Sequence, residues 1–209
     1  GENTIKTDSV GNTLWTSSFS AEDGFQTPDG GYISSCYWGD NEGIVRINNQ
    51  GDTLWTKPSF RGASIVPADD GGFVFTNSSC SGAPLNPLQN NKKSEKDCHQ
   101  INLFKIDSIG NLVWSKTYFP EPLYGDGASK NMIKTSDGGY MIFSTRQMVI
   151  KTDMFGDSLW TREYNISVPN PYNGRISSGC QTVDGGYIII GNDLNDSIFL
   201  LKIDSLGNQ

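Results

Sequence analysis

Short apolar runs rich in β-branched and aromatic residues recur along the whole chain, separated by polar turns that contain Asp, Asn and Gly. Such runs favour β-strands, and such turns favour hairpins. In the first complete unit they predict strands at 22–27, 31–37, 43–48 and 53–59, with boundaries uncertain by about 2–4 residues. The 24 glycines, five Trp, eight Tyr and ten Phe agree with an all-β protein that has many tight turns.

Two phrases alternate strictly through the sequence. The copies of the first are IKTDSVGNTLW (5–15), VRINNQGDTLW (45–55), FKIDSIGNLVW (104–114), IKTDMFGDSLW (150–160) and LKIDSLGNQ (201–209). The second, Asp-Gly-Gly followed by Tyr or Phe, occurs at 29–32, 70–73, 137–140 and 184–187. Both predict hairpins, because Asp can bond its own turn amides and Gly accepts positive φ. Each unit therefore has four short strands.

The spacing of the units indicates a β-propeller. Successive glycines of the first phrase (Gly11, Gly51, Gly110, Gly156 and Gly207) lie 40, 59, 46 and 51 residues apart. Propeller blades are four-stranded units of about 40–50 residues. A single sheet cannot bury both of its faces, so we expect the repeated aromatic residues to pack between blades.

We therefore expect one all-β domain over 1–209, a β-propeller of four-stranded antiparallel blades with about four repeats. The repeats are expected at roughly 1–19 (partial), 20–60, 61–118, 119–164 and 165–209, with a loop insertion at 77–100 that is rich in Ser, Asn, Pro and Lys.

The two ends of the array leave two arrangements open. Residues 3–7 and 12–18 supply the third and fourth strands of a unit, whereas 174–182, 186–192 and 197–203 supply the first three. In one arrangement the strand at 12–18 completes the last blade and closes a four-bladed ring. In the other the chain is a segment of a longer propeller, which is favoured because a third strand occurs at both ends.

The alternation of IKTDSVGNTLW (5–15) with TVDGGYIIIG (182–191) resembles the propeller repeats of large secreted Bacteroidetes proteins, many of which end in a type IX secretion sorting domain. The resemblance covers nearly the whole chain. It implies an extracellular or outer-surface location and further domains of the same parent chain, but no single shared activity. The Asp-Ser/Thr-apolar triplets at 8–10, 52–54, 107–109, 157–159, 196–198 and 204–206 also resemble an O-glycosylation acceptor of that group.

Charge and hydropathy exclude two classes of partner. The net charge is −7, and only Lys92 and Lys93 form a cluster of cations. Nucleic-acid binding needs clustered Lys and Arg to displace the counterions of phosphates, so no nucleic-acid partner is expected. No stretch approaches about 18 apolar residues, so no membrane span is expected.

The four cysteines form an even number, which suits an oxidising compartment. Cys80 and Cys98 bracket the insertion, and we expect a disulfide between them, worth roughly 3 kcal/mol if the geometry allows it. Cys36 and Cys180 lie within strands of two different repeats. They either bridge across a closed ring or are buried thiols.

Loop length separates the two faces of the array. Both Asp-marked hairpins lie on one face and keep a nearly constant length, whereas the connections on the other face vary. Variable loops on a rigid scaffold are where binding residues concentrate. We therefore expect a protein or carbohydrate ligand on this long-loop face. The candidate ligand-binding residues are Tyr37, Trp38, His99, Tyr124, Asp126, Arg146 and Tyr172.

The sequence argues against catalysis. His99 is the only histidine, and a zinc site would need three or four His or Cys ligands. No catalytic residue, metal or cofactor is expected. The enzyme alternative is a glycosidase-like propeller, because sialidases place an Asp-box hairpin where Asp8–Gly11 falls. That box separates Asp from Gly by one residue, whereas this chain separates them by two. The preferred function is a non-catalytic binding module, and a purely structural spacer is the third hypothesis.

Overall fold

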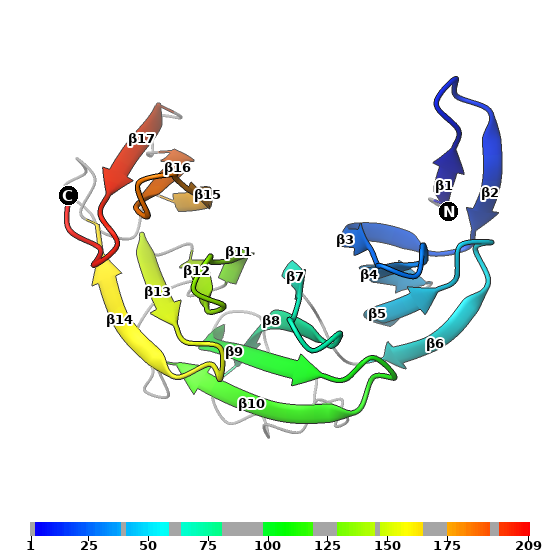
Figure 1. The fold of residues 1–209 in the computed structure, drawn as a ribbon, viewed down its shortest axis with the longest axis horizontal. Helices are drawn as coiled ribbons and strands as arrows, with labels where there is room; N and C mark the ends of the chain where they lie inside the picture. The colour runs from blue at the N-terminus through cyan, green and yellow to red at the C-terminus, as the bar shows by residue number, and fades with distance from the viewer. Residues whose placement is uncertain are drawn as a thin grey trace.

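A computed structural model describes residues 3–38, 41–58, 64–80, 98–118, 129–144, 147–164, 175–192 and 197–209. Within these ranges the chain forms five antiparallel β-sheets, arranged in sequence order as an open arc (Figure 1). The described residues contain no helix that is long and apolar enough to cross a membrane.

Each sheet is a meander in which strands adjacent in sequence are paired. The N-terminal sheet has β1 (Thr4–Thr7) and β2 (Thr13–Ser17). Blade 1 has β3 (Ser20–Gln26), β4 (Tyr32–Trp38), β5 (Asn41–Ile47) and β6 (Thr53–Pro58). Blade 2 has β7 (Ser64–Pro67), β8 (Phe73–Cys80), β9 (Cys98–Ile106) and β10 (Leu112–Tyr118). Blade 3 has β11 (Ser129–Lys134), β12 (Tyr140–Ser144), β13 (Met148–Thr152) and β14 (Ser158–Glu163), and the C-terminal sheet has β15 (Arg175–Gln181), β16 (Tyr187–Asn192) and β17 (Ile198–Ile203).

The blades follow the predicted propeller architecture. The first strand of each blade lies on the inner side of the arc, and the fourth strands β6, β10 and β14 lie along its outer rim (Figure 1). The four strands predicted for blade 1 are all present, with boundaries that differ by one or two residues. In the closed-ring arrangement β2 would pair with the last blade. In the structure β2 pairs with β1, and β17 pairs only with β16 among the described strands, so that arrangement is not adopted.

The predicted insertion at 77–100 is partly strand. β8 continues to Cys80 and β9 begins at Cys98, so the ladder extends further than the Ser- and Asn-rich sequence indicated. Asn77 pairs with Asn102 and Ser79 with Gln100 in this extension. Backbone pairing between two long neighbouring strands does not require apolar side chains, so composition alone misplaced the strand ends.

The hydrophobic core lies between successive sheets. Ile33 and Ile44 of blade 1 pack against Phe73, Phe75 and Phe104 of blade 2. The same repeat positions form the next interfaces: Val74 and Leu103 meet Tyr140 and Ile142, and Met141 and Val149 meet Tyr187 and Ile189. Each blade thus covers one face of its neighbour. The aromatic residue after each Asp-Gly-Gly packs between blades, as predicted, and it faces the preceding sheet.

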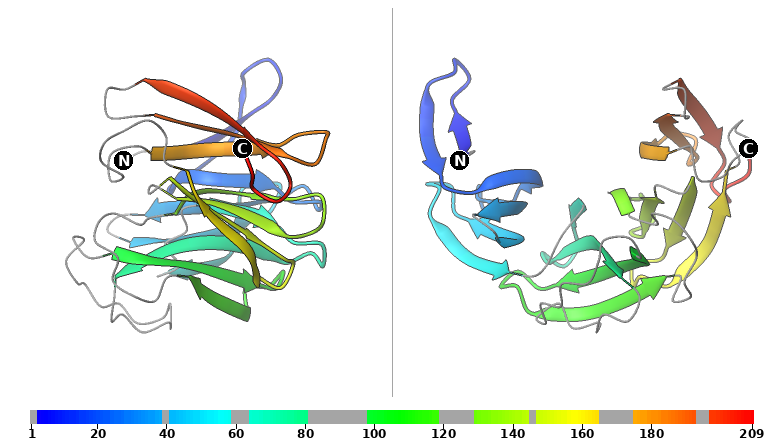
Figure 2. Two further views of the ribbon diagram at one scale, coloured as in Figure 1. Left: turned by 90° about the vertical axis from the view of Figure 1, so that its left-hand side faces the viewer. Right: turned by 180° about the vertical axis from the view of Figure 1, so that it is seen from behind.

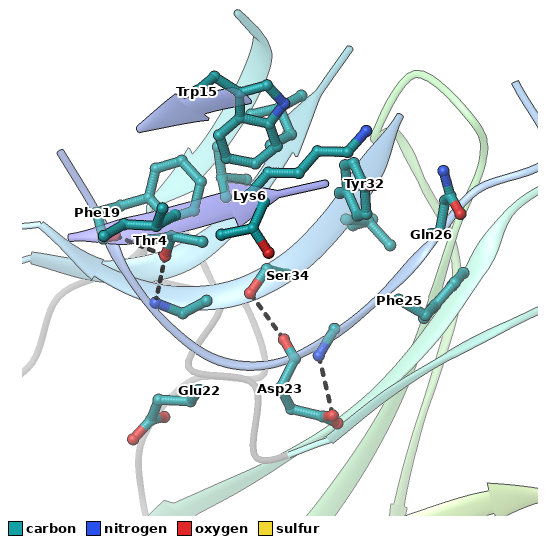
Figure 3. Close-up of a pocket in the computed structure, with 17 residues that line it drawn as sticks. Thr4, Lys6, Trp15, Phe19, Glu22, Asp23, Phe25, Gln26, Tyr32 and Ser34 are labelled. Carbon is teal, nitrogen blue, oxygen red and sulfur yellow. Dashed lines mark hydrogen bonds between the residues drawn. The ribbon is translucent and has the colours of Figure 1, made fainter. Parts of the chain in front are cut away.

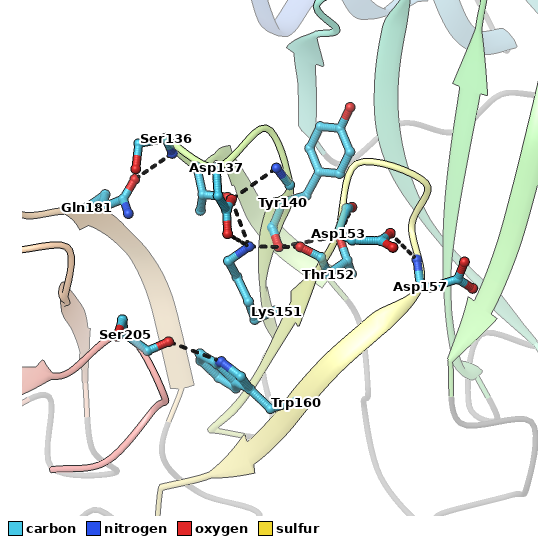
Figure 4. Close-up of polar contacts among 12 residues, drawn as sticks. Ser136, Asp137, Tyr140, Lys151, Thr152, Asp153, Asp157, Trp160, Gln181 and Ser205 are labelled. Atoms are coloured by element: carbon cyan, nitrogen blue, oxygen red, sulfur yellow. Dashed lines mark hydrogen bonds and ion pairs between the residues drawn. The ribbon is translucent and has the colours of Figure 1, made fainter.

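The Trp of each first phrase packs against the turn of the next repeat. A Cβ on Gly51 would lie 2.8 Å from the Trp15 ring, so this glycine is required by space as well as by its φ of 91°. The Trp15 Nε1 donates to the Asn49 carbonyl, and Trp160 Nε1 donates to that of Ser205, both at 3.2 Å (Figure 4). At Gly11 the corresponding space is open among the described residues.

A basic side chain in each third strand pairs with the Asp of the Asp-Gly-Gly turn. Lys151 Nζ lies 2.8 Å from Asp137 and also donates to the Thr152 carbonyl (Figure 4). The other three pairs are Arg46–Asp29, Lys105–Asp70 and Lys202–Asp184. The cation side chains are 6, 13 and 3% exposed in blades 1, 2 and 3 but 47% exposed in the C-terminal sheet. Packing by a following blade therefore removes the cation from solvent, whereas the aspartate side chains stay 54–63% exposed in all four sheets.

The outer face of the C-terminal sheet is apolar and exposed. Ile188, Ile190, Ile198 and Leu200 are 36, 40, 76 and 71% exposed. The residues at the position of Leu200 in blades 1, 2 and 3 are Ile44, Leu103 and Val149, all fully buried. The repeat thus places apolar side chains at this position in every blade, including the one that no neighbouring sheet covers among the described residues.

The repeat supplies a matched pair of substitutions that measures inter-blade packing. We expect Leu103→Ala to lower the free energy of unfolding by about 2–5 kcal/mol, because it empties a fully buried site. Leu200→Ala, at the equivalent exposed position, should change it by less than about 0.5 kcal/mol. Urea denaturation followed by circular dichroism measures both. Equal losses in the two variants would show that burial between blades does not set the stability.

The aspartate pairs predict a loss of stability in acid. Hydrogen bonds from the Thr27 hydroxyl, the Gly31 amide and the Arg46 guanidinium lower the pKa of Asp29 to about 2. A carboxyl whose pKa is lowered on folding stabilises the fold above its unfolded pKa of about 3.9 and loses that contribution as pH falls through the folded value. We expect unfolding free energy to fall between about pH 4 and pH 2. Asp29→Asn should weaken the fold at pH 7 and make this acid loss less steep, whereas identical profiles would contradict the assignment.

Candidate functional site

The predicted binding residues are only partly within the described structure. Tyr37, near the end of β4, is 41% exposed. The backbone of Trp38 ends β4, and that of His99 lies in β9 rather than in a loop; the side chains of both are outside the description. Tyr124, Asp126, Arg146 and Tyr172 lie outside the described residues.

The strand order places the two classes of connection on opposite faces. In an antiparallel meander the first-to-second and third-to-fourth turns lie at one end of the sheet, and the second-to-third connection lies at the other. Both Asp-marked turns of each blade therefore share one face (Figure 2, left). Trp38, Cys80 and Cys98, at the ends of their strands, belong to the opposite face, the predicted long-loop face.

A second candidate site was not expected from the sequence. A recess of about 500 Å³ lies between the N-terminal sheet and blade 1, on β1, β3, β4 and β5 (Figure 3). Its walls are mainly apolar, with charged groups at three positions. The lining residues are Thr4, Ile5, Lys6, Thr7, Trp15, Phe19, Ala21, Glu22, Asp23, Gly24, Phe25, Gln26, Tyr32, Ile33, Ser34, Val45 and Ile47.

Aromatic side chains and a lysine shape the recess. The Trp15 and Tyr32 rings meet edge to face, with centroids 5.8 Å apart and planes at 71°. Lys6 Nζ lies 5.2 Å from the centroid of the Tyr32 ring, a cation–π arrangement. At the base, the Thr4 hydroxyl donates to the Phe19 carbonyl at 2.8 Å and accepts from the Ala21 amide at 3.1 Å. The recess thus has an apolar interior, a cation at one side and a fixed base.

A polar belt connects the innermost strands beside this recess. Asp23 Oδ2 accepts from both the Ser64 hydroxyl and the Ile65 amide at 3.0 Å. Ser64 also contacts Asn131 Oδ1 at 3.3 Å, and Asn131 Nδ2 donates to the Ser178 hydroxyl at 2.8 Å. The belt therefore runs from blade 1 through blades 2 and 3 to the C-terminal sheet, and its polar groups bond mainly to one another.

The sequence contained a signal for this belt. Asp23, Ser64, Asn131 and Ser178 each stand seven residues before the first glycine of an Asp-Gly-Gly turn. A polar residue at one fixed position of every repeat, inside a strand, indicates contact between repeats. The recess had no comparable signal, because it depends on which strands of the first sheet are present.

The site offers little for a metal ion. The described residues contain no group of three or more His, Cys, Asp or Glu side chains placed to hold one. The turn aspartates bond their own backbone: Asp8 Oδ1 accepts from the Val10 and Asn12 amides at 3.0 and 2.9 Å. Hydrogen bonds from Asn12 lower the pKa of Asp8, so its charge is used within the turn.

Comparisons with known proteins agree with the fold. A crystal structure of a protein of unknown function from Bacteroides caccae matches with a TM-score of 0.61 and 14% identity, over 99% of this chain and 72% of that one. The Dos1 propeller matches with a TM-score of 0.59 and 12% identity, over 95% of this chain and 52% of that one. At these identities the similarity shows the fold alone, and it confirms the predicted β-propeller. No model of a protein family matches the chain, and no curated protein does.

Proposed function

We propose that this chain is a non-catalytic binding or spacer module of a secreted or cell-surface protein, which binds a protein or a carbohydrate on its long-loop face. The observation that carries the proposal is the difference between the two faces of the array. One face holds the constant Asp-marked turns, whose polar groups bond within the fold. The other face receives the connections of variable length, which are free to carry recognition.

The state of the acidic groups favours binding over hydrolysis. A glycosidase needs two carboxyls with separated roles, one of them a general acid with a raised pKa. The turn aspartates Asp107 and Asp184 have pKa values below the usual range because they accept hydrogen bonds. Lys202, Thr182 and Gly186 act in this way on the pKa of Asp184, and Asn111 acts on that of Asp107. Groups engaged in this way are poorly suited to donate a proton.

Tyr37 and Trp38 are the best-placed candidates for the binding surface. They are consecutive aromatic residues at the end of β4, on the long-loop face, and Tyr37 is 41% exposed. Aromatic side chains at the rim of a rigid sheet suit the apolar faces of sugars and the centres of protein interfaces.

The proposed disulfide would brace the same face. Cys80 and Cys98 are direct partners across β8 and β9, at the end of both strands. Cross-strand partners in an antiparallel pair have Cβ atoms about 4.5–5.5 Å apart, close to the separation that a disulfide needs. The bridge would close the base of the longest connection and limit its conformations. The even cysteine count and this pairing support an oxidising location, and the exposed serines at 9, 108, 158 and 205 suit glycosylation of the turns.

Thiol labelling tests the disulfide. Burial raises the pKa of Cys36 to about 12, so the native thiol should resist iodoacetamide, while exposed Cys180 should react. Protein secreted into an oxidising medium should therefore take one label when native, two when denatured and four when denatured and reduced, as counted by intact mass. Four labels in the denatured, unreduced protein would contradict the bridge.

Ligand screening with matched aromatic variants tests the binding face. On a glycan and polysaccharide array we expect Trp38→Ala to weaken binding by at least about tenfold, since buried aromatic anchors dominate such interfaces. Phe155→Ala is the control, because Phe155 is 59% exposed in an Asp-marked turn on the opposite face. If only Phe155→Ala lost binding, the ligand site would lie on the face of the Asp-marked turns, and the proposal would be wrong. Cleavage of a glycan would contradict the non-catalytic assignment.

A further inference from the structure

The N-terminal sheet contains only the outer half of a blade. β1 corresponds to the third strands β5, β9, β13 and β17, because all five begin the repeated first phrase. Each of those four strands pairs with a second strand on its inner side. β1 pairs only with β2 among the described strands, and its inner edge borders the recess (Figure 3). The Thr4 amide donates to the Phe19 carbonyl at 3.0 Å, and no described strand pairs with this edge.

In the complete interfaces, a second strand fills the volume that corresponds to the recess. Its residue after the aromatic position, Ile33, Val74 or Met141, is fully buried against the next sheet. Tyr32 of blade 1 occupies the position of Phe73, Tyr140 and Tyr187, which those aliphatic side chains help to cover. At the recess no second strand supplies such a residue, and Tyr32 lines an open cavity instead.

The position of Lys6 points to the same occupant. Lys6 stands at the position of Arg46, Lys105, Lys151 and Lys202, each of which pairs with the Asp of an Asp-Gly-Gly turn. Within the part of the chain that the structure describes, Lys6 forms no ion pair and its Nζ lies over the Tyr32 ring. A carboxylate presented by a hairpin turn beside β1 would give Lys6 the partner that its four counterparts have.

We propose that the recess binds the first two strands of a further repeat of the same kind, a β-hairpin with the sequence pattern Asp-Gly-Gly-aromatic-aliphatic. Its second strand adds to the free edge of β1 by backbone hydrogen bonds. Its aliphatic side chain fills the recess above Tyr32, and its aspartate pairs with Lys6. The result is a complete four-stranded blade with the same interface that already joins blades 1, 2 and 3.

A second copy of this chain is a poorer occupant. The four Asp-Gly-Gly hairpins of the chain are already held in their own sheets, and each of their second strands is hydrogen-bonded on both sides. Donating one would break an existing sheet. A hairpin that is not yet part of a blade carries no such cost.

A graft tests the proposal with the chain's own sequence. Val149 occupies the repeat position of Thr4, and residues 129–148 directly precede it. A copy of residues 129–148 joined directly to Thr4 therefore keeps the native spacing between the hairpin and the third strand. We expect the graft to raise the thermal unfolding midpoint by about 5 °C or more and to slow amide hydrogen exchange along β1. A graft of the same composition in scrambled order is the control and should do neither.

The proposed ion pair with Lys6 gives a second test, because a gain in stability that came only from the added chain length would not depend on it. Asp137→Asn in the grafted copy, or Lys6→Gln in the recess, should each reduce the gain, and the two together should reduce it no further than one alone. Additive effects, or a scrambled graft that stabilises equally, would overturn the proposal. Sedimentation of the ungrafted chain completes the test: a dimer that Lys6→Gln dissociates would assign the recess to a second copy and overturn the proposed occupant.

Discussion

The structure depends on one constraint: a four-stranded sheet with apolar residues on both faces cannot be stable alone. Each blade solves this by lying against the next, so the core is a series of interfaces rather than a single centre. Ile33 under Phe73, Val74 under Tyr140 and Met141 near Tyr187 are three copies of one contact. The Trp against each following glycine and the cations buried in blades 1, 2 and 3 lie at the same interfaces.

This constraint also separates the residues that build the fold from those that we propose bind a ligand. The constant residues of the repeat, including many of its aspartates, form hydrogen bonds within turns and ion pairs within blades, so we place the proposed ligand surface elsewhere. What varies lies on the opposite face, where the connections differ in length from blade to blade. The proposed ligand surface at Tyr37 and Trp38 thus arises from the variable loops, and the proposed hairpin site at Lys6 arises from the two-stranded N-terminal sheet.

The sequence predicted the blades well because the repeat contains the information several times over. Turn aspartates and glycines located the hairpins, and strand limits in blade 1 differed by one or two residues. The insertion at 77–100 was misplaced because pairing of Asn77 with Asn102 rests on backbone contacts that composition does not report. The basic residue of each third strand, such as Lys105 or Lys151, stands at a fixed position of the repeat. Its partner, the aspartate of the Asp-Gly-Gly turn, could be identified only from the fold. The recess could not be predicted, since it is defined by strands that are not present beside β1.

Native-state amide hydrogen exchange tests the central claim, that inter-blade burial sets the stability of each sheet. The second strands β8, β12 and β16 have equivalent sequence positions and backbone pairing, but only β16 has an uncovered outer face. The account predicts strong protection in β8 and β12, weaker protection in β16, and the weakest in β1 of the two-stranded sheet. Equal protection in all four strands would contradict it, because stability would then reside within the individual sheets.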